Sequence, residues 1–289
     1  MKILAILFFL FTASFQCLHA KIFPTRLTCE YLTDPPVIDA ANPRLSWVNI
    51  AEEGERGQIQ TAWEIRVAGT REQLISGSAG LWSSGKVLSD QSFNVRYGGK
   101  PLVSGQECWW QVRVWDKNDK ISGWSEPAFW RMGLLREADW KAKWIGPPWQ
   151  GEEALPKPSN PGAGLPGQLP PPAPLLRKEF SVSGKVARAV AYVTGLGYFE
   201  FWLNGEKVGE DVLVPNQTNY GKRPSLPLEN IPLDDNFREY RVMYLAYDVS
   251  DKLTEGPNVL GAILGNGFYN PAKYWAGSYG TPRFIMQLH

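Results

Sequence analysis

The feature that most constrains the fold of this chain is a succession of short apolar runs between Leu27 and Met132, each ended by Gly, Pro, Asn or Asp. In the run 108–115, successive side chains of a strand would point to opposite faces. We therefore expect one face, with Trp110 and Val112, to be buried and the other to be half covered. No segment of this region has the periodicity of an amphipathic helix, so the pattern predicts an all-β structure.

Strands are expected where β-branched and aromatic residues lie between turn residues. In this first region they are Arg44–Val48, Ala62–Ala68, Phe93–Tyr97 and Cys108–Trp115. Their spacing indicates a fibronectin type III or immunoglobulin-like sandwich of roughly 100 residues. Most of the 13 tryptophans then belong to the core. Those that lie inside strand patterns are Trp47, Trp63, Trp110 and Trp115.

A second β region follows a Pro- and Gly-rich stretch, residues 146–174, whose composition cannot form a sheet interior. The expected strands are Val186–Val193, Tyr198–Leu203, Glu206–Val208, Arg241–Val249, Val259–Leu264 and Arg283–Leu288. Asn204-Gly205 is typical of a tight hairpin turn. No turn follows the last strand, so its sheet would expose a long apolar edge. We therefore expect the natural protein to continue beyond His289.

The first twenty residues have the pattern of a signal peptide. Lys2 precedes an apolar run, and a small residue, Ala20, stands where signal peptidase would cut. We expect export to the periplasm or the cell exterior. Of the three cysteines, Cys29 and Cys108 would remain after cleavage. They could pair in an oxidising compartment or stay as buried free thiols, and the sequence leaves both open.

The positions of the two histidines limit which kinds of catalytic site the chain can contain. His19 lies in the expected signal peptide and His289 is the last residue, so the expected mature chain has no internal histidine. A His-dependent nucleophile or zinc site is therefore not expected. The adjacent carboxylates are Glu52-Glu53, Glu152-Glu153, Glu210-Asp211 and Asp234-Asp235. Such neighbours usually mark solvated turns, and the last pair lacks a calcium-loop pattern. We assign no catalytic residue, metal site or cofactor to this chain, and the sequence leaves calcium binding at an acidic turn such as Asp234-Asp235 open.

The charge balance bears on partners. With 30 Lys and Arg against 29 Asp and Glu, the chain has no basic footprint for nucleic acid. The mature sequence shows no membrane-spanning run. Aromatic rings that stack on pyranose faces make carbohydrate the better candidate. The carbohydrate-contact candidates are Tyr269, Tyr274 and Trp275, because they lie in a turn-rich stretch, and loops at the ends of sandwiches often carry recognition.

Several segments, in this order and spacing, resemble a known family. In the first region they are Asn42-Pro43-Arg44-Leu45-Ser46-Trp47, Leu81–Val87, Val112–Asp116, Trp124-Ser125-Glu126 and the joining segment Asp139–Ile145. In the second they are Gly195–Glu200, Leu203-Asn204-Gly205, Tyr247-Asp248-Val249 and Leu264–Tyr269. The chain resembles the N-terminal region of bacterial α-L-rhamnosidases of the inverting, (α/α)6-barrel kind. The stretch 146–174 and the segment Pro224–Tyr240 look like insertions relative to that family.

The resemblance implies a domain order: signal peptide 1–20, fibronectin III or Ig-like sandwich 21–138, connecting segment and linker 139–175, and an incomplete jelly-roll-like sandwich of carbohydrate-binding type, 176–289. It further implies hydrolysis of terminal α-L-rhamnosyl groups by a catalytic barrel that packs on these modules and is absent from this chain. The modules would be an inactive scaffold. The competing hypothesis is a stand-alone secreted carbohydrate-binding or adhesion protein.

Overall fold

The computed structural model describes residues 20–147, 173–218, 220, 241–270 and 279–289. It divides into two compact units, with the boundary between Leu135 and Arg136. The regular secondary structure of each unit is almost entirely β-strand, as predicted. In the described part of the chain, no helix has both the length and the apolar character needed to cross a membrane.

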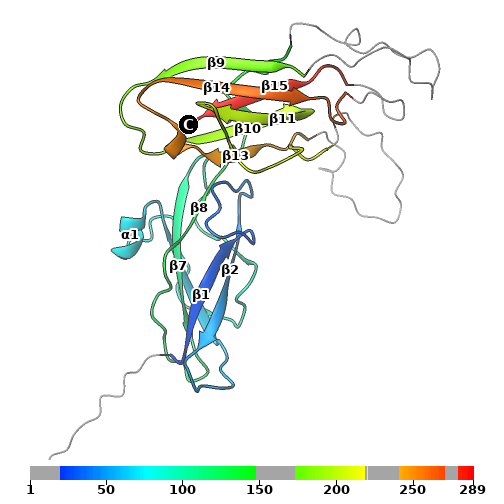
Figure 1. Ribbon diagram of the computed structural model, residues 1–289. Coiled ribbons are helices and arrows are strands. Elements are labelled where there is room, and N and C mark those ends of the chain that lie inside the picture. Colours follow the sequence, from blue (N-terminus) through cyan, green and yellow to red (C-terminus); the bar gives the residue numbers. More distant parts are fainter. Residues whose placement is uncertain (1–19, 148–172, 219, 221–240, 271–278) are drawn as a thin grey trace, which may run out of the picture. The chain divides into compact units, whose positions relative to one another are not determined.

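The first unit contains two antiparallel sheets (Figure 1). One sheet joins, in order, β1 (Ile22–Cys29), β2 (Arg44–Ala51) and β6 (Val95–Arg96). The other joins β4 (Trp82–Ser83), β3 (Ala62–Ala68), β7 (Glu107–Trp115) and β8 (Ala128–Arg131), and β5 (Val87–Leu88) also pairs with β3.

Inward-facing residues of both sheets form the core of the first unit. The buried face expected for β7 is confirmed, because Trp110 and Val112 are fully buried, but Gln111 and Trp115, on the face expected to be half covered, are buried as well. The tryptophans expected inside strands, Trp47 and Trp63 included, are buried, but most of the described tryptophans are not. The region also contains one short helix that was not expected, α1 (Arg71–Ile75). With five residues it is too short to show a periodic pattern, and the Thr70 side chain caps it by accepting from the Gln73 N–H.

The second unit also has two antiparallel sheets. The first sheet has the order β13 (Leu245–Asp248), β10 (Val190–Leu196), β15 (Arg283–Leu288). The second has the order β12 (Glu206–Lys207), β11 (Tyr198–Leu203), β14 (Gly256–Gly265), β9 (Leu175–Val182). Short 3-10 turns are η1 (Glu137–Asp139) and η4 (Ser250–Lys252). The core between the sheets contains Phe199, Phe201, Leu203, Leu264 and Phe284.

The hairpin from β11 to β12 forms at Asn204-Gly205, as predicted, and both residues have positive φ, 52° and 88°. Two expectations for this unit were wrong. Strand β9 was not predicted, and β10 begins at Val190 and ends at Leu196, whereas the expected strand began at Val186 and ended at Val193. The expected strands Phe93–Tyr97 and Arg241–Val249 are shorter in the structure, as β6 and β13 show.

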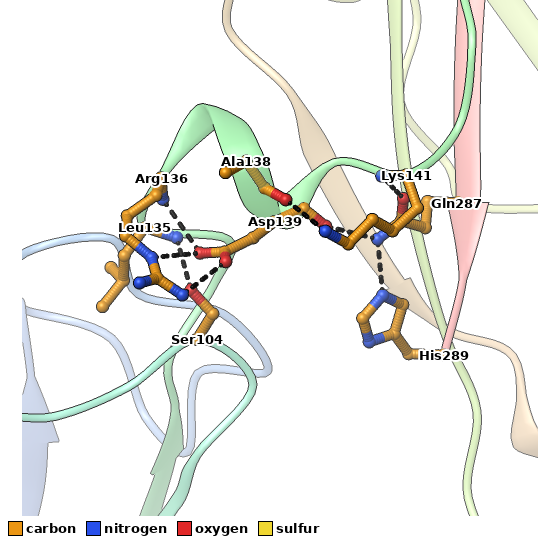
Figure 2. A network of polar contacts seen from close by, with 8 residues as sticks. All are labelled: Ser104, Leu135, Arg136, Ala138, Asp139, Lys141, Gln287 and His289. Atoms are coloured by element: carbon orange, nitrogen blue, oxygen red, sulfur yellow. Dashed lines mark hydrogen bonds and ion pairs between the residues drawn. The ribbon is translucent and has the colours of Figure 1, made fainter.

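The outer edge of β15 has a neighbour, which corrects the expectation of an open apolar edge. Ile145 and Phe284 exchange two backbone hydrogen bonds, of 2.9 and 2.8 Å. Further along, the Gln287 side chain accepts from the backbone N–H groups of Lys141, at 2.5 Å, and Ala142, at 3.0 Å. Its amide donates to the Asp139 carbonyl at 2.9 Å (Figure 2). The segment after η1 therefore runs along β15.

Other expectations concern residues outside the described ranges. These are the signal peptide up to residue 19, most of the Pro-rich linker, and the segment 224–240. Ala20, the expected last residue of the signal peptide, is buried, and its N–H donates to the Ile121 carbonyl at 3.0 Å. The open question about the cysteines has an answer in the structure: Cys29 and Cys108 are free thiols, both buried.

Candidate carbohydrate-contact site

The candidate site is a cluster of tyrosines at the ends of β11 and β14 in the second unit. Tyr269 follows β14, and its ring centroid lies 5.2 Å from that of Tyr220 and 5.7 Å from that of Tyr279. The rings of Tyr220 and Tyr279 lie 5.5 Å apart. The Tyr279 N–H donates to the Tyr269 carbonyl at 2.9 Å, which fixes the two residues side by side. The other two predicted contact residues, Tyr274 and Trp275, lie outside the described residues.

Glycines let the backbone approach the fourth tyrosine, Tyr198, the first residue of β11. A Cβ built on Gly267 would lie 3.3 Å from the Tyr198 ring, so this turn packs directly against it. Gly197 has φ +98°, and a Cβ there would lie 2.3 Å from the Gly265 carbonyl oxygen. Only glycine fits that position without moving the backbone. The two glycines thus hold the turn and Tyr198 together.

Burial of the rings shapes the electrostatics of the tyrosine cluster. Burial raises the pKa of Tyr220, and the neighbouring hydroxyls of Tyr198, Tyr269 and Tyr279 raise it further. Burial also raises the pKa of Tyr269, although the nearby Arg283 acts in the opposite direction. The phenols of Tyr220 and Tyr269 are therefore neutral at physiological pH. A neutral hydroxyl both donates and accepts a hydrogen bond, which suits sugar hydroxyls.

Sequence analysis identified only Tyr269 of these four described tyrosines. Tyr198 carried a usable signal, since strand alternation places it on the face of β11 opposite the buried Phe199. Tyr220 and Tyr279 carried none, because they come from separate loops that meet only in the folded unit.

Several carboxylates of the described residues are held in ion pairs or hydrogen bonds, such as Glu52 with Lys21 at 3.0 Å. Of the adjacent pairs, Glu152-Glu153 and Asp234-Asp235 lie outside the described ranges. Asp211 accepts a hydrogen bond of 3.0 Å from the Tyr247 hydroxyl. Within the same described ranges, no group of three or more His, Cys, Asp or Glu side chains is placed to hold a metal ion.

Comparison with protein-family models matches both units. Residues 24–136 match a family described as Rha78A-like, N-terminal immunoglobulin domain. Residues 184–231 and 229–289 match the alpha-L-rhamnosidase N-terminal domain.

Individual proteins agree with these matches. An alpha-L-rhamnosidase of Formosa agariphila is 35% identical over 99% of this chain, which spans 30% of that relative. Another, of Alteromonas sp., is 34% identical over 92% of the chain, which spans 26% of the relative.

Solved structures show the same fold. The alpha-L-rhamnosidase of Dictyoglumus thermophilum matches this chain with a TM-score of 0.73 at 34% sequence identity. The match covers 92% of this chain and 27% of the chain of that enzyme. A Streptomyces avermitilis alpha-L-rhamnosidase in complex with L-rhamnose matches this chain with a TM-score of 0.72 at 24% sequence identity. The match covers 92% of this chain and 39% of the chain of that enzyme.

The chain thus spans about a third or less of the curated relatives given above. Both of its units match N-terminal domains of one family, in the order in which they follow one another along the chain. The chain belongs, through these two N-terminal domains, to the α-L-rhamnosidase family.

Proposed function

We propose that this chain is the accessory, non-catalytic N-terminal part of an enzyme that hydrolyses terminal α-L-rhamnosyl groups of glycosides or plant polysaccharides. The observation that carries the proposal is the match of both units to N-terminal domains of α-L-rhamnosidases. The relatives named above are themselves alpha-L-rhamnosidases, and this chain spans only a minor part of them.

Inverting glycosidases need two carboxyl groups, one that protonates the leaving oxygen and one that activates water. In this proposal neither group comes from the present chain. The two sandwiches act as a rigid scaffold that packs on an (α/α)6 barrel, and the barrel supplies the acid and the base. The well-packed cores that the described residues form in both units support the scaffold role.

The tyrosine cluster is the part of the scaffold that we propose to contact carbohydrate. Tyr198, Tyr220, Tyr269 and Tyr279 come together at the loop end of one sandwich. Their rings offer apolar faces and edges, and their neutral hydroxyls offer donors and acceptors. Tyr274 and Trp275, in the adjoining stretch, remain proposed members of this site.

Export is a further element of the proposal. Residues 1–20 would act as a signal peptide and deliver the protein to the periplasm or the cell exterior, where plant polysaccharides are met. Detection of a mature N-terminus at Lys21, by sequencing protein from the periplasm or the medium, would support this. A mature protein that retains Met1 inside the cytoplasm would contradict it.

The proposal is tested by reading the coding sequence past the codon for His289. We expect an open frame of several hundred codons whose product has helical periodicity. A stop codon directly after His289 would contradict the proposal and favour the stand-alone carbohydrate-binding protein, which the tyrosine cluster would suit.

A further inference from the structure

A second surface of the second unit, away from its core, has the composition of a sugar platform. In β11 the odd-numbered side chains Phe199, Phe201 and Leu203 are buried, so Tyr198, Glu200 and Trp202 lie on the outer face of the sheet. The indole of Trp202 is partly exposed there. A partly exposed indole on a sheet face offers an apolar ring surface on which a pyranose can stack.

The strand register shows what lies beside Trp202. Its neighbour on β12 is Lys207, its neighbour on β14 is Gly261, and the next residue across, on β9, is Arg177. The sheet face thus carries one row of a cation, an indole, a glycine and a second cation. Gly261 has no side chain, so the sheet surface is lower at Gly261 than at its neighbours Trp202 and Arg177.

Few atoms of the described residues lie above Gly261. Among them, only the Trp202 Cβ, at 3.7 Å, and the Leu176 carbonyl oxygen, at 4.0 Å, would lie within van der Waals range of a Cβ built there. No atom of the Trp202 indole ring lies within 4 Å of that Cβ. The ring therefore does not cover the glycine, whereas aromatic side chains that shield a strand glycine do cover it. Trp202 therefore borders the position above Gly261 through its Cβ.

The charges on this face are paired with one another. Lys207 binds Glu200 at 3.2 Å, and Arg177 binds Glu179 at 2.5 Å. The row therefore has polar groups that can hydrogen-bond hydroxyls but no net charge to attract an acidic ligand. Two apolar side chains of the neighbouring row, Ile263 and Leu175, are 38% and 74% exposed.

We propose that this outer face of β11, β14 and β9 binds a neutral oligosaccharide, with one pyranose ring seated on Gly261 against Trp202. Tyr198, four residues earlier on β11, pairs with Gly265 and repeats the aromatic and glycine pair on the same face. At about 3.3 Å per residue, the two pairs lie about 13 Å apart. This span exceeds one ring, so the ligand is a chain of sugars, and it leads from Trp202 to the tyrosine cluster.

The test uses the whole chain, labelled with 15N, and follows the indole N–H signals by NMR. The probes are the monosaccharide and the tetrasaccharide of α-L-rhamnose, together with cellotetraose and tetragalacturonate. The choice of rhamnose rests on the proposed function, whereas the site itself is argued without it. The Trp202→Phe variant identifies the Trp202 signal by deleting it.

We expect the Trp202 signal to shift with a neutral tetrasaccharide, more weakly with the monosaccharide, and not with tetragalacturonate. The Gly261→Val variant fills the open position without strain, since Gly261 has no positive φ and β-branched residues suit strands. It should weaken binding about tenfold or more, equivalent to about 1.4 kcal/mol. The matched control is Gly80→Val, at an exposed glycine of the other unit with no atom within 4 Å, and it should bind as the parent does.

Three results would overturn the inference. The first is an unchanged Trp202 signal with both neutral tetrasaccharides up to about 10 mM, a range in which weak sugar binding is still measurable. The second is unchanged affinity in Gly261→Val. The third is a Trp202 shift that depends on protein concentration without sugar, which would assign the face to a second copy of the chain. Binding of cellotetraose but not of the rhamnose tetrasaccharide would support the site and contradict its link to rhamnosides.

Discussion

At the residue scale, one buried carboxylate organises the start of the first unit. Asp116 follows β7, is fully buried, and accepts from the N–H groups of Asn118, at 2.8 Å, Lys21, at 2.9 Å, and Lys120, at 3.0 Å. Burial alone would raise the pKa of this carboxyl group, but these hydrogen bonds outweigh it, and the pKa lies below the ordinary value. Asp116 therefore stabilises the fold as a carboxylate.

We predict that Asp116→Asn destabilises the protein by about 1–3 kcal/mol at pH 7, because an amide replaces an acceptor-only group. A lowered pKa in the folded state means that the stabilisation is complete above about pH 4 and is lost as the pH falls through the folded-state value. Urea unfolding at pH 7 and at about pH 2 should show a large difference between variant and parent only at pH 7.

The control is Asp119→Asn, whose side chain is 70% exposed and pairs with Lys86. An exposed ion pair contributes at most about 1 kcal/mol. Equal losses in the two variants would contradict the role assigned to Asp116.

The two buried thiols lead to a second prediction. Burial raises the pKa of Cys29 well above its usual range and that of Cys108 to about 12, with a smaller contribution from nearby Glu107 to the latter. Thiolates are the reactive form, so neither cysteine should react with iodoacetamide at pH 8 in the native chain that begins at Lys21. Both should react in denaturant. Ser78→Cys, at an exposed position, is the positive control, and rapid native labelling of Cys29 or Cys108 would contradict the prediction.

Single residues were predictable where burial follows a period of two. The alternation in β7 was enough to place Trp110 in the core. The partners of Tyr269 could not be predicted, because contacts between loops depend on how the strands are ordered in the sheet, and a single sequence does not contain that order.

At the element scale, Gln287 joins the segment after η1 to β15. Its side chain makes three hydrogen bonds with that backbone while being 8% exposed. Nearby, Trp140 packs edge-on against Tyr244 at 5.6 Å. Strand β15 is thereby covered on its outer edge by residues that come from far earlier in the chain.

We predict that Gln287→Leu destabilises the second unit by about 2–3 kcal/mol, because two N–H groups and one carbonyl lose their partners. Met286→Leu, on the same strand, is the volume-conserving control and should cost less than about 1.5 kcal/mol. Hydrogen exchange should become faster at the amides of Lys141 and Ala142 in Gln287→Leu only. Unchanged protection at both amides would show that other contacts hold the segment.

The strands that bury one face were easier to predict from the sequence than the strand whose side chains are mostly exposed. The bounds of β3, β11 and β15 agree with the expected strands because these are bordered by turns and carry apolar residues on a buried face. Strand β9 escaped because most of its side chains are exposed, and its sequence, Leu-Leu-Arg-Lys-Glu-Phe-Ser-Val, has no clear alternation. Helix α1 is a single turn, and the Thr70 and Gln73 spacing of a capping box was its one signal.

At the scale of the whole molecule, family membership followed from the order of many weak motifs, and the two family models agree with it. Fold class followed from the turn spacing. The carbohydrate-contact residues could not be predicted from the family resemblance. A shared fold locates a binding site only where the residues of the site themselves match.

The central claim is that these modules are an accessory region without a catalytic site of their own. The most direct test is to incubate the pure chain with 4-nitrophenyl α-L-rhamnopyranoside and to measure the release of nitrophenol. The account predicts no release above the rate without protein, because it places the catalytic acid and base on the barrel. Turnover that copurifies with the chain through successive columns would contradict it.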